Sequence, residues 1–357
     1  MSVTGCVSIK EQAWAFTLSI ARHRLAVMFS KGSPAALLLA GVATFFIFPT
    51  GILANQSCAR CDEVATGFAS LNGGTTGGNG GRIVTVKSHV ELKKAAAATE
   101  PLIIRIDGII KSDPKGFEVP VTSDKTIIGV GANSGIFGGG FNIRNRRNVI
   151  IRNLRVSGTY NPNDYPGKQD DFDAIQVDNS TNIWIDYVHF SAMADGLIDL
   201  RTDTDYVTVS RSIISNHNKA FGIGWTTNVI SKVTINDCFF NSTNTRNPSA
   251  GNVKYGHLYN NYYRNITQYG NYARGITALL IETSYFDDVF DPIVAGPDAS
   301  IKTNWVKFRN CKGETHLNVK SETVFDASKF YQYTLRDPYD IPIDIPYFSG
   351  PRAEIGI

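Results

Sequence analysis

The chain has 357 residues, 43% of them hydrophobic and 19% charged, which is ordinary for a soluble globular protein of one large domain or two. Its 32 glycines and the near absence of long helical periodicity argue against a helical protein and favour many short strands and tight turns. A net charge of +3 excludes no class of partner, although it suits a polyanionic one.

The N-terminus has the layout of a secretory signal. Residues 35–48 form an apolar run, AALLLAGVATFFIF, which Pro49 and a small-residue end follow. We therefore predict a leader over residues 1–54, cleaved near Ala54, and a secreted protein. A membrane anchor is the alternative, but the run is shorter than the roughly 20 apolar residues of a spanning helix. Met28 is an alternative start, because a signal that begins there has ordinary proportions.

Five cysteines are too few for a disulfide scaffold in a chain of this length, so a hydrophobic core must supply the stability. Cys6 belongs to the predicted leader. Cys58 and Cys61 could close a small local ring after cleavage, although a CxxC spacing alone is a weak signal and a metal site needs more ligands.

Past the leader, two short signals precede the first strands. The glycine cluster at residues 73–78 could cradle a phosphate, but the lysine and the following helix of a P-loop are absent, so we favour a structural turn. Ser88 and Glu91 have the spacing of a capping box, which predicts a short helix that ends before Pro101. It is the only helix that the mature sequence predicts.

From Leu102 onward one pattern recurs, an apolar alternation followed by a polar residue that is usually Asn. Its later copies lie 23 to 27 residues apart, beginning at Ile183, Val207, Val233, Gly256, Leu279 and Val306. Repeats of this length without intervening helices predict an all-β solenoid, a parallel β-helix, with Asn side chains stacked at the strand ends. A propeller is the alternative, but each blade needs four strands in about 40 residues.

The repeat also bears on the last two cysteines. Cys238 and Cys311 each lie five residues after the start of a copy, three copies apart. Stacked strands would then separate them by roughly 14 Å. Because a disulfide needs Cα atoms within about 7 Å, we predict that these two are not bonded to each other.

Residues 169–199 concentrate carboxylates around an apolar strand. The four are Asp171, Asp173, Asp195 and Asp199. Carboxylates this dense repel one another unless protons or a cation intervene, and a hard divalent ion takes oxygen ligands of this kind. Solvated loop aspartates are the alternative.

The solenoid gives these residues a common phase. Asp171 and Asp195 each precede the next copy by 12 residues, Lys219 precedes it by 14 and Arg246 by 10. They should form a stripe about 15 Å long on one face, acidic at one end and basic at the other. Exposed loops often carry charge, but this order suits an anionic chain held by a metal bridge and cationic side chains.

From about Gly67 to the C-terminus, the sequence resembles the polysaccharide lyase family 1 pectate lyases. The resemblance rests on NGGTTGGNGG, DKTIIGVGANSGIFGGG, DFDAI, NIWIDY, DGLIDL, YVTVS, HNKA, TRNPS and GHLYNNYY. It implies a single right-handed parallel β-helix domain over residues 55–357. It also implies Ca²⁺-dependent β-elimination on polygalacturonate that gives 4,5-unsaturated oligogalacturonides.

The resemblance assigns roles to individual residues. Asp171, Asp173, Asp195 and Asp199 would be the calcium ligands, Lys219 would bind a substrate carboxylate, and Arg246 would be the catalytic base. It further implies an extracellular monomer that acts on pectin, with no nucleic-acid partner and no membrane association after signal cleavage.

The sequence also departs from the family. Many members have a second arginine five residues after the catalytic one, where this chain has Gly251, and a histidine where it has Tyr187. One extra residue also precedes His257. We expect Lys254, or a neighbour in the altered loop, to take over part of the missing arginine's role in binding carboxylate.

The chemistry explains why such residues are needed. Removing a proton from C5 of galacturonate places negative charge beside a carboxylate, so that carboxylate must first be neutralised by a cation and by Lys219. The base must lie within hydrogen-bond reach of the C5 proton. Arginine normally keeps its proton, and positive surroundings would favour its neutral form.

Three alternatives remain at this stage. A polygalacturonase-type hydrolase is disfavoured because its NTD and RIK motifs are absent from the sequence. A non-catalytic carbohydrate-binding β-helix would not require the Asp, Lys and Arg stripe. A pectin lyase acts on methyl-esterified pectin without calcium and would not need the acidic cluster. Asn179, Asn241 and Asn265 begin glycosylation sequons, which matter only in a eukaryotic secretory pathway.

Overall fold

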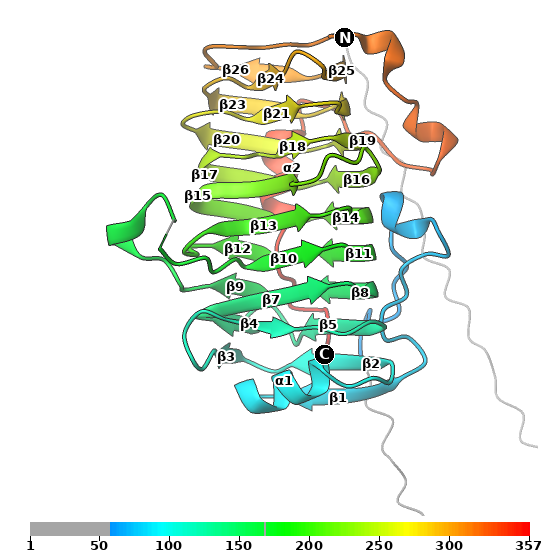
Figure 1. Ribbon diagram of the computed structural model, residues 1–357, viewed down its shortest axis with the longest axis vertical. Coiled ribbons are helices and arrows are strands. Elements are labelled where there is room, and N and C mark those ends of the chain that lie inside the picture. The colour runs from blue at the N-terminus through cyan, green and yellow to red at the C-terminus, as the bar shows by residue number, and fades with distance from the viewer. Residues whose placement is uncertain (1–57, 168) are drawn as a thin grey trace, which may run out of the picture. The chain divides into compact units, whose positions relative to one another are not determined.

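In the computed structural model, the repeated apolar runs form parallel strands stacked one above the other (Figure 1). The structure describes residues 58–167 and 169–357, so the predicted leader lies outside the described residues. Among the described residues, no helix is long and apolar enough to cross a membrane. The predicted parallel β-helix is confirmed.

One wall of the solenoid is a ten-stranded sheet in which every neighbouring pair is parallel. It consists of β1 (Arg82–Val86), β2 (Leu102–Ile106), β5 (Lys125–Gly129), β8 (Arg147–Arg152), β11 (Thr181–Asp186), β14 (Asp205–Ser210), β16 (Ser231–Asn236), β19 (Val253–Tyr259), β22 (Ala278–Glu282) and β25 (Ser300–Asn304).

Two further rows of strands form a sixteen-stranded sheet because the long β15 (Ile213–Gly224) belongs to both. The first row contains β3 (Ile109–Lys111), β6 (Gly135–Phe137), β9 (Arg155–Ser157), β12 (His189–Ser191), β17 (Phe239–Thr245), β20 (Tyr262–Ile266), β23 (Tyr285–Val289) and β26 (Lys307–Arg309). The second row, called the site row below, contains β4 (Phe117–Pro120), β7 (Gly139–Arg144), β10 (Ile175–Asp178), β13 (Gly196–Arg201), β18 (Ser249–Gly251), β21 (Asn271–Arg274) and β24 (Ile293–Ala295).

Side chains of like shape stack along the interior. In the ten-stranded sheet, one unbroken ladder of paired, almost fully buried positions is Ile104, Ile127, Ile151, Ile185, Val209, Ile235, Leu258 and Ile281. Branched aliphatic side chains suit this pleated, buried surface. On the other wall, rings stack from coil to coil, with centroids 4.4 Å apart for Tyr263 and Phe286. The core thus runs the length of the coil and holds its outer faces in place.

The register confirms most of the predicted copies and corrects the last. Val149, Ile183, Val207, Val233, Gly256 and Leu279 are paired in sequence. Leu279, however, pairs with Ile301 on β25, and Val306 leads into β26 on the other wall. The run SIKTN lacks the apolar alternation, so the next apolar stretch was mistaken for it. Cys311 is therefore out of register with Cys238, although both cysteines are unbonded as predicted.

The corners between the two walls use left-handed backbone, but only some of them carry Asn. Successive corner residues with positive φ are Asn153, Tyr187, Arg211, Asp237, Asn260 and Thr283. Asn is favoured there because its side chain tolerates this conformation. The predicted Asn ladder is therefore partial: Thr283 donates to Asn260 at 2.7 Å, and Asn260 lies 3.4 Å from Asp237.

The predicted helix is α1 (His89–Ala96), which lies at the end of the coil where the described chain begins (Figure 1). Its capping box is formed, with Glu91 N donating to Ser88 Oγ at 3.3 Å and Ser88 N donating to the Glu91 carboxylate at 3.1 Å. A second helix, α2 (Ile341–Phe348), was not predicted, and it contains Pro342 and Pro346. Ile341 and Ile345 bury it against the first row.

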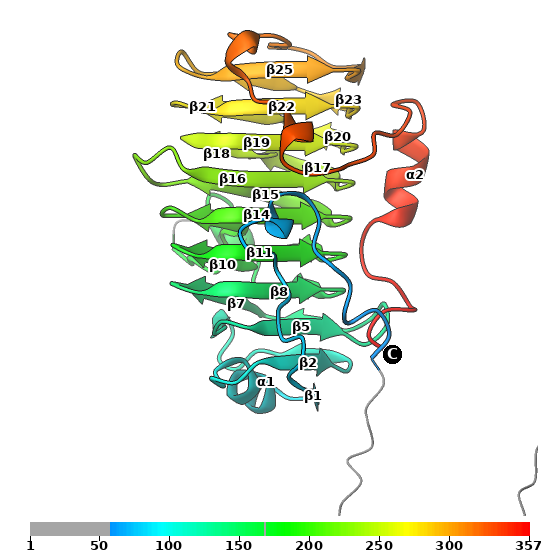
Figure 2. The same cartoon turned by 90° about the vertical axis from the view of Figure 1, so that its right-hand side faces the viewer.

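Segments from both ends of the described chain run along the outside of the ten-stranded sheet (Figure 2). They carry the 3₁₀ helices η1 (Gly67–Ser70), η3 (Ser321–Thr323) and η4 (Ala327–Lys329), while η2 (Pro162–Asp164) lies between β9 and β10. Thr234 on β16 joins both segments, since it accepts from Phe68 N at 3.0 Å and contacts Tyr331 Oη at 2.8 Å. A disulfide joins Cys58 and Cys61. This sheet is therefore covered, and the site row carries the exposed polar groups.

Candidate active site

The site row brings the predicted aspartates together. Asp171 and Asp173 precede β10, Asp195 precedes β13, and Asp199 lies on β13. Carboxylate oxygens of Asp171, Asp173 and Asp195 all lie within 4.8 Å of one another. Asp199 stands outside this group but shares a neighbour with it. A Cβ added at Gly196 would lie 2.8 Å from an oxygen of Asp173 and 3.1 Å from one of Asp199.

Two of these four carboxylates are buried without enough partners. Asp173 is fully buried and Asp199 is 4% exposed. Oδ2 of Asp173 and Oδ1 of Asp199 have no hydrogen-bond partner among the described residues. Burial, together with the charges of Asp199, Glu118 and Asp195, raises the pKa of Asp173. Burial also raises the pKa of Asp199 to about 7, although Arg246 opposes the rise.

Such oxygens fit a hard cation. Unsatisfied buried carboxylate oxygens are costly, and calcium takes several of them from Asp and Glu side chains. The donor set is therefore suited to Ca²⁺, with Asp171, Asp173 and Asp195 closest together and Asp199 beside them.

A fifth carboxylate was not predicted. Glu118 on β4 accepts from Asp173 N at 2.9 Å and from the Asn142 side chain at 3.2 Å. Burial raises its pKa. Glu118 lies before the regularly spaced copies that begin at Ile183, so the spacing of the repeat could not predict that it lies beside Asp173.

Lys219 lies at the acidic cluster, as predicted. It forms an ion pair with Asp195 and donates to Gly167 O at 3.0 Å. His217, two residues earlier on β15, contacts Asp195 O through Nε2. Burial lowers the pKa of His217 to about 4, so the imidazole is neutral at ordinary pH. Lys219 is thus the only cation in direct contact with Asp195 among the described residues.

Arg246 lies on the next coil, just after β17, and its charge acts on Asp199. Its guanidinium carbon is 5.5 Å from the ring centroid of Trp225, and Arg201 approaches the same ring at 5.8 Å. Neither Trp225 nor Arg201 was singled out in the sequence. The structure therefore brings Arg246 to the aspartates with an aromatic ring beside it.

Lys254 is not brought to this site. It lies on β19 of the ten-stranded sheet, with Nζ 5.4 Å from the ring centroid of Tyr255. Tyr255 in turn packs against Phe325 and Phe330 of the segment that covers that sheet, at 4.7 and 5.2 Å. Lys254 therefore belongs to the covered wall and not to the site row.

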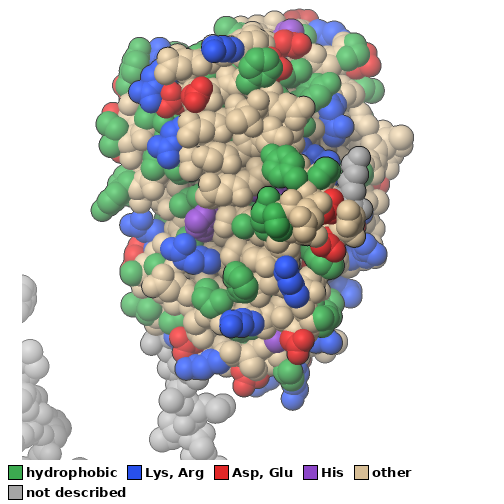
Figure 3. Space-filling view, turned by 90° about the vertical axis from the view of Figure 1, so that its left-hand side faces the viewer, with side chains coloured by type: hydrophobic (Ala, Val, Ile, Leu, Met, Phe, Trp, Pro, Cys, Tyr) green, Lys and Arg blue, Asp and Glu red, His purple; other side chains and the backbone are tan. Residues whose placement is uncertain are grey.

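Open grooves adjoin the cluster. One, of about 590 Å³, is lined by residues that include Lys115, Glu118, Asn142, Asp171 and Phe172. Another, of about 460 Å³, is lined only by uncharged residues and neutral His217, among them Tyr160, Tyr165, Asn218 and Asn244. Figure 3 shows the side from which the segment between β9 and β10 projects, where uncharged surface fills the middle of the upper half and Lys and Arg lie around it.

These features define a class of protein: a parallel β-helix that has, on one outer face, a cluster of carboxylates suited to binding a cation. A sequence model of the family described as pectate lyase matches residues 35–339. The chain therefore belongs to the pectate lyase family, and the resemblance drawn from its motifs is confirmed.

The relatives agree. The chain is 33% identical to pectate lyase A of Aspergillus niger over 300 residues, 80% of this chain and 87% of that protein. It is 37% identical to the pectate trisaccharide-lyase of Thermotoga maritima over 228 residues, 60% of this chain and 61% of that protein, so it spans less than two thirds of that relative. Among solved structures, pectate lyase Bsp165PelA from Bacillus sp. N165 in complex with trigalacturonate superimposes with a TM-score of 0.68. That match is 26% identical and covers 80% of this chain and 98% of that one.

Proposed function

We propose that the protein is a secreted, monomeric, calcium-dependent lyase that cleaves polygalacturonate by β-elimination and leaves 4,5-unsaturated oligogalacturonides. The observation that carries the proposal is the pair of buried, unpartnered carboxylate oxygens on Asp173 and Asp199, beside Lys219 and Arg246. The family and the trigalacturonate complex of the Bacillus relative support the choice of polymer.

Asp171, Asp173, Asp195 and Asp199 would hold the calcium ion, which when bound would supply positive charge to a substrate carboxylate. Lys219 would bind the same substrate carboxylate. Its side chain is 17% exposed at the edge of the cluster, and its ammonium would replace the ion pair with Asp195 by one with the substrate. The groove beside Asp171, with Lys115 in its wall, offers the neighbouring sugars a path.

In this proposal Arg246 takes the C5 proton. Its charge acts on Asp199, and Lys219 is paired with Asp195 of the same acidic cluster. A general base must lie within hydrogen-bond reach of the C5 proton and must have a free lone pair to accept it. Proton removal at C5 is followed by loss of the C4 oxygen, so the bond breaks without water.

The test is an ultraviolet assay on polygalacturonate, which detects the unsaturated product directly. Product should form with calcium, stop with chelator and return when calcium is restored. Arg246→Lys keeps the charge but changes the geometry, so turnover should fall at least 100-fold while calcium still binds. Lys254→Ala, a cation removed from the other wall, is the matched control and should retain activity.

Other outcomes would identify the alternatives. New reducing ends without ultraviolet absorbance would indicate a hydrolase. Full activity on methyl-esterified pectin in chelator would indicate a pectin lyase. Calcium-dependent binding without any cleavage would leave a carbohydrate-binding protein. Full activity of Asp195→Ala without added metal would overturn the proposed metal site.

A further inference from the structure

The ring of Trp225 lies against the outer face of the sheet at the site row. Trp225 follows β15, and its side chain folds back over Gly222, where an added Cβ would collide with the indole and would lie 2.7 Å from Asp199 Oδ1. Despite this contact, 48% of Trp225 is exposed. The indole is therefore about half exposed beside Asp199 and Arg246.

The left-handed backbone of Trp225 does not explain its position. Trp305 has the same φ of 54° and is 71% exposed. Trp305, however, follows β25 of the ten-stranded sheet, with no ring over a glycine and no guanidinium beside it among the described residues. What distinguishes Trp225 is Gly222, which has no side chain beside the ring, and the two guanidinium groups over the ring, from Arg201 and Arg246.

Backbone that carries no side chain also occurs on the next coils, at further glycines. Gly224 lies against Gly251 of the adjacent coil, which in turn pairs with Arg274 on β21. The Arg274 side chain folds back over Gly251, and a terminal nitrogen lies 3.5 Å from the point where a Cβ would be. Arg274 is exposed, and its guanidinium has no ion pair or hydrogen bond with any described residue. Asp178, by contrast, already neutralises Arg201.

We propose that Trp225 and Arg274 form a subsite for one anionic sugar ring next to Arg246. This inference rests on the proposed function and names residues for it. The indole would pack the apolar C–H face of a galacturonate unit, since a large aromatic face is suited to an amphipathic ring. Arg274 would pair with that unit's carboxylate, because an unpaired guanidinium is a strong, planar donor to carboxylates.

The ligand class follows from the groups present. A neutral sugar would use the indole but leave Arg274 unpaired, and a small anion would use Arg274 but not the indole. Only a uronic acid ring satisfies both at once. β18 separates β15 from β21, so the two strands lie roughly 9.6 Å apart, and Arg274 folds back over Gly251, which brings its guanidinium one coil closer to Trp225.

The first test reads binding without relying on catalysis. Rapid mixing with trigalacturonate in calcium, followed before product accumulates, should quench tryptophan fluorescence in the wild-type protein. Trp225→Phe should abolish at least 80% of that change, because Trp184 is fully buried and Trp305 lies on the other wall. Trp305→Phe is the matched control and should keep the full change. An equal quench in Trp225→Phe would overturn the subsite.

The second test separates substrate binding from positioning of Arg246. Trp225→Ala and Arg274→Ala should each raise KM for polygalacturonate about tenfold while kcat stays within about twofold, as expected for loss of a uniform binding contact. Arg82→Ala, which removes an equal charge from the first strand of the other wall, should change neither constant. Lower kcat at unchanged KM would instead make Trp225 a positioning residue for Arg246 and would overturn the proposal.

The two proposals fail in different ways. If the wild-type protein forms no unsaturated product but trigalacturonate still quenches Trp225, the lyase function fails and the subsite stands. If product forms and both alanine variants bind substrate as the wild type does, the subsite alone fails.

Discussion

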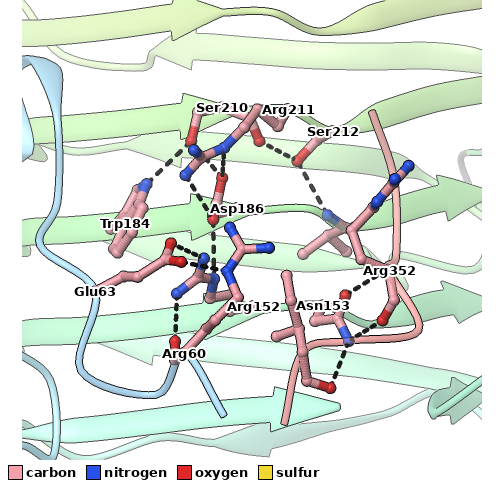
Figure 4. Close-up of polar contacts among 12 residues, drawn as sticks. Arg60, Glu63, Arg152, Asn153, Trp184, Asp186, Ser210, Arg211, Ser212 and Arg352 are labelled. Carbon is pink, nitrogen blue, oxygen red and sulfur yellow. Dashed lines mark hydrogen bonds and ion pairs between the residues drawn. The ribbon is translucent and has the colours of Figure 1, made fainter. Parts of the chain in front are cut away.

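Two groups of carboxylates in this protein differ in how completely the chain itself neutralises their charge. On the covered wall, Asp186 accepts from Arg211 at 2.8 and 2.9 Å and from Ser210 at 2.7 Å, and Arg152 approaches it at 3.0 Å (Figure 4). Arg152 is 1% exposed and is also paired with Glu63 of the N-terminal segment. Each charge in this cluster is compensated by the chain itself.

In the site row, the compensation is missing. Asp173 and Asp199 are almost as deeply buried as Asp186, yet each has an oxygen without a partner among the described residues. Burial and neighbouring carboxylates raise the pKa values of Asp173 and Asp195. For Arg211, burial alone would lower the pKa, but the charge of Asp186 and its hydrogen bonds outweigh that effect, so the pKa of Arg211 is raised. Burial alone therefore does not mark a functional site. Burial of charge that the chain leaves unpaired does, because something from outside must supply the balance.

The largest effect should come from breaking the compensated group. Asp186→Ala leaves Arg152 and Arg211 buried without their shared partner, which should cost about 3–5 kcal/mol of the free energy of unfolding. Urea unfolding monitored by circular dichroism measures this. Asp171→Ala is the control, since it removes an exposed carboxylate from the uncompensated group and should not destabilise the calcium-free protein. A loss below about 1 kcal/mol in Asp186→Ala would show that the two groups do not differ as described.

Calcium should have the second largest effect, and only through the site row. At a calcium concentration 100 times the Kd, the free energy of unfolding should rise by about 2.7 kcal/mol. Asp195→Ala should lose this gain, while a conservative change on the covered wall, such as Arg211→Lys, should keep it. Differential scanning fluorimetry across a calcium titration gives the comparison. Equal stabilisation of Asp195→Ala would place the bound ion elsewhere.

The pH dependence of the calcium-free protein sharpens the same contrast. The pKa of Asp199 is about 7 in the folded state and 3.8 when unperturbed, so between these values the folded state binds more protons than the unfolded state. The contribution of Asp199 to stability then falls as pH rises from about 4 to 7. Asp199→Asn removes this group, and at pH 8 in chelator it should be more stable than the wild type. At pH 4 the two proteins should be nearly equal. A constant difference from pH 4 to 8 would assign the effect to packing instead of charge.

Most of the fold could be predicted from the sequence because each coil is formed by one short, recurring segment of the chain. Each copy from Val149 to Leu279 contains its own alternation, so stacking it on the next requires no long-range information. The final coil was misplaced because Ser300–Asn304 pairs through its backbone without that alternation. Helix α2 was missed because its stability comes from burying Ile341 and Ile345 on a surface that other coils create.

The sequence could predict the site residues that share a position in the repeat. It could not predict those whose side chains reach across to a neighbouring part of the coil. Asp171, Asp195, Lys219 and Arg246 share a phase in the repeat, and Asp173 and Asp199 lie near Asp171 and Asp195 in the sequence. The structure brings these residues together. Lys254 was misjudged because the chain turns a corner at Asn252, with φ of 56°, and passes to the other wall before reaching it. Trp225 and Arg274 could not be placed from sequence, since both lie where they do because Gly222 and Gly251 have no side chains.

The smallest effect should come from a pair that is compensated but exposed. Arg82 and Glu100 form an ion pair at 3.2 Å, with side chains 70% and 51% exposed. Water already solvates both charges, and holding two long side chains together costs entropy, so Arg82→Ala should change the free energy of unfolding by less than about 0.5 kcal/mol. The urea midpoint of this variant, measured beside that of Asp186→Ala, tests whether pairing or burial governs the difference between the two groups. A loss comparable to that of Asp186→Ala would mean that ion pairing stabilises this solenoid wherever it occurs, and the unpaired oxygens of Asp173 and Asp199 would then lose their value as a sign of a binding site.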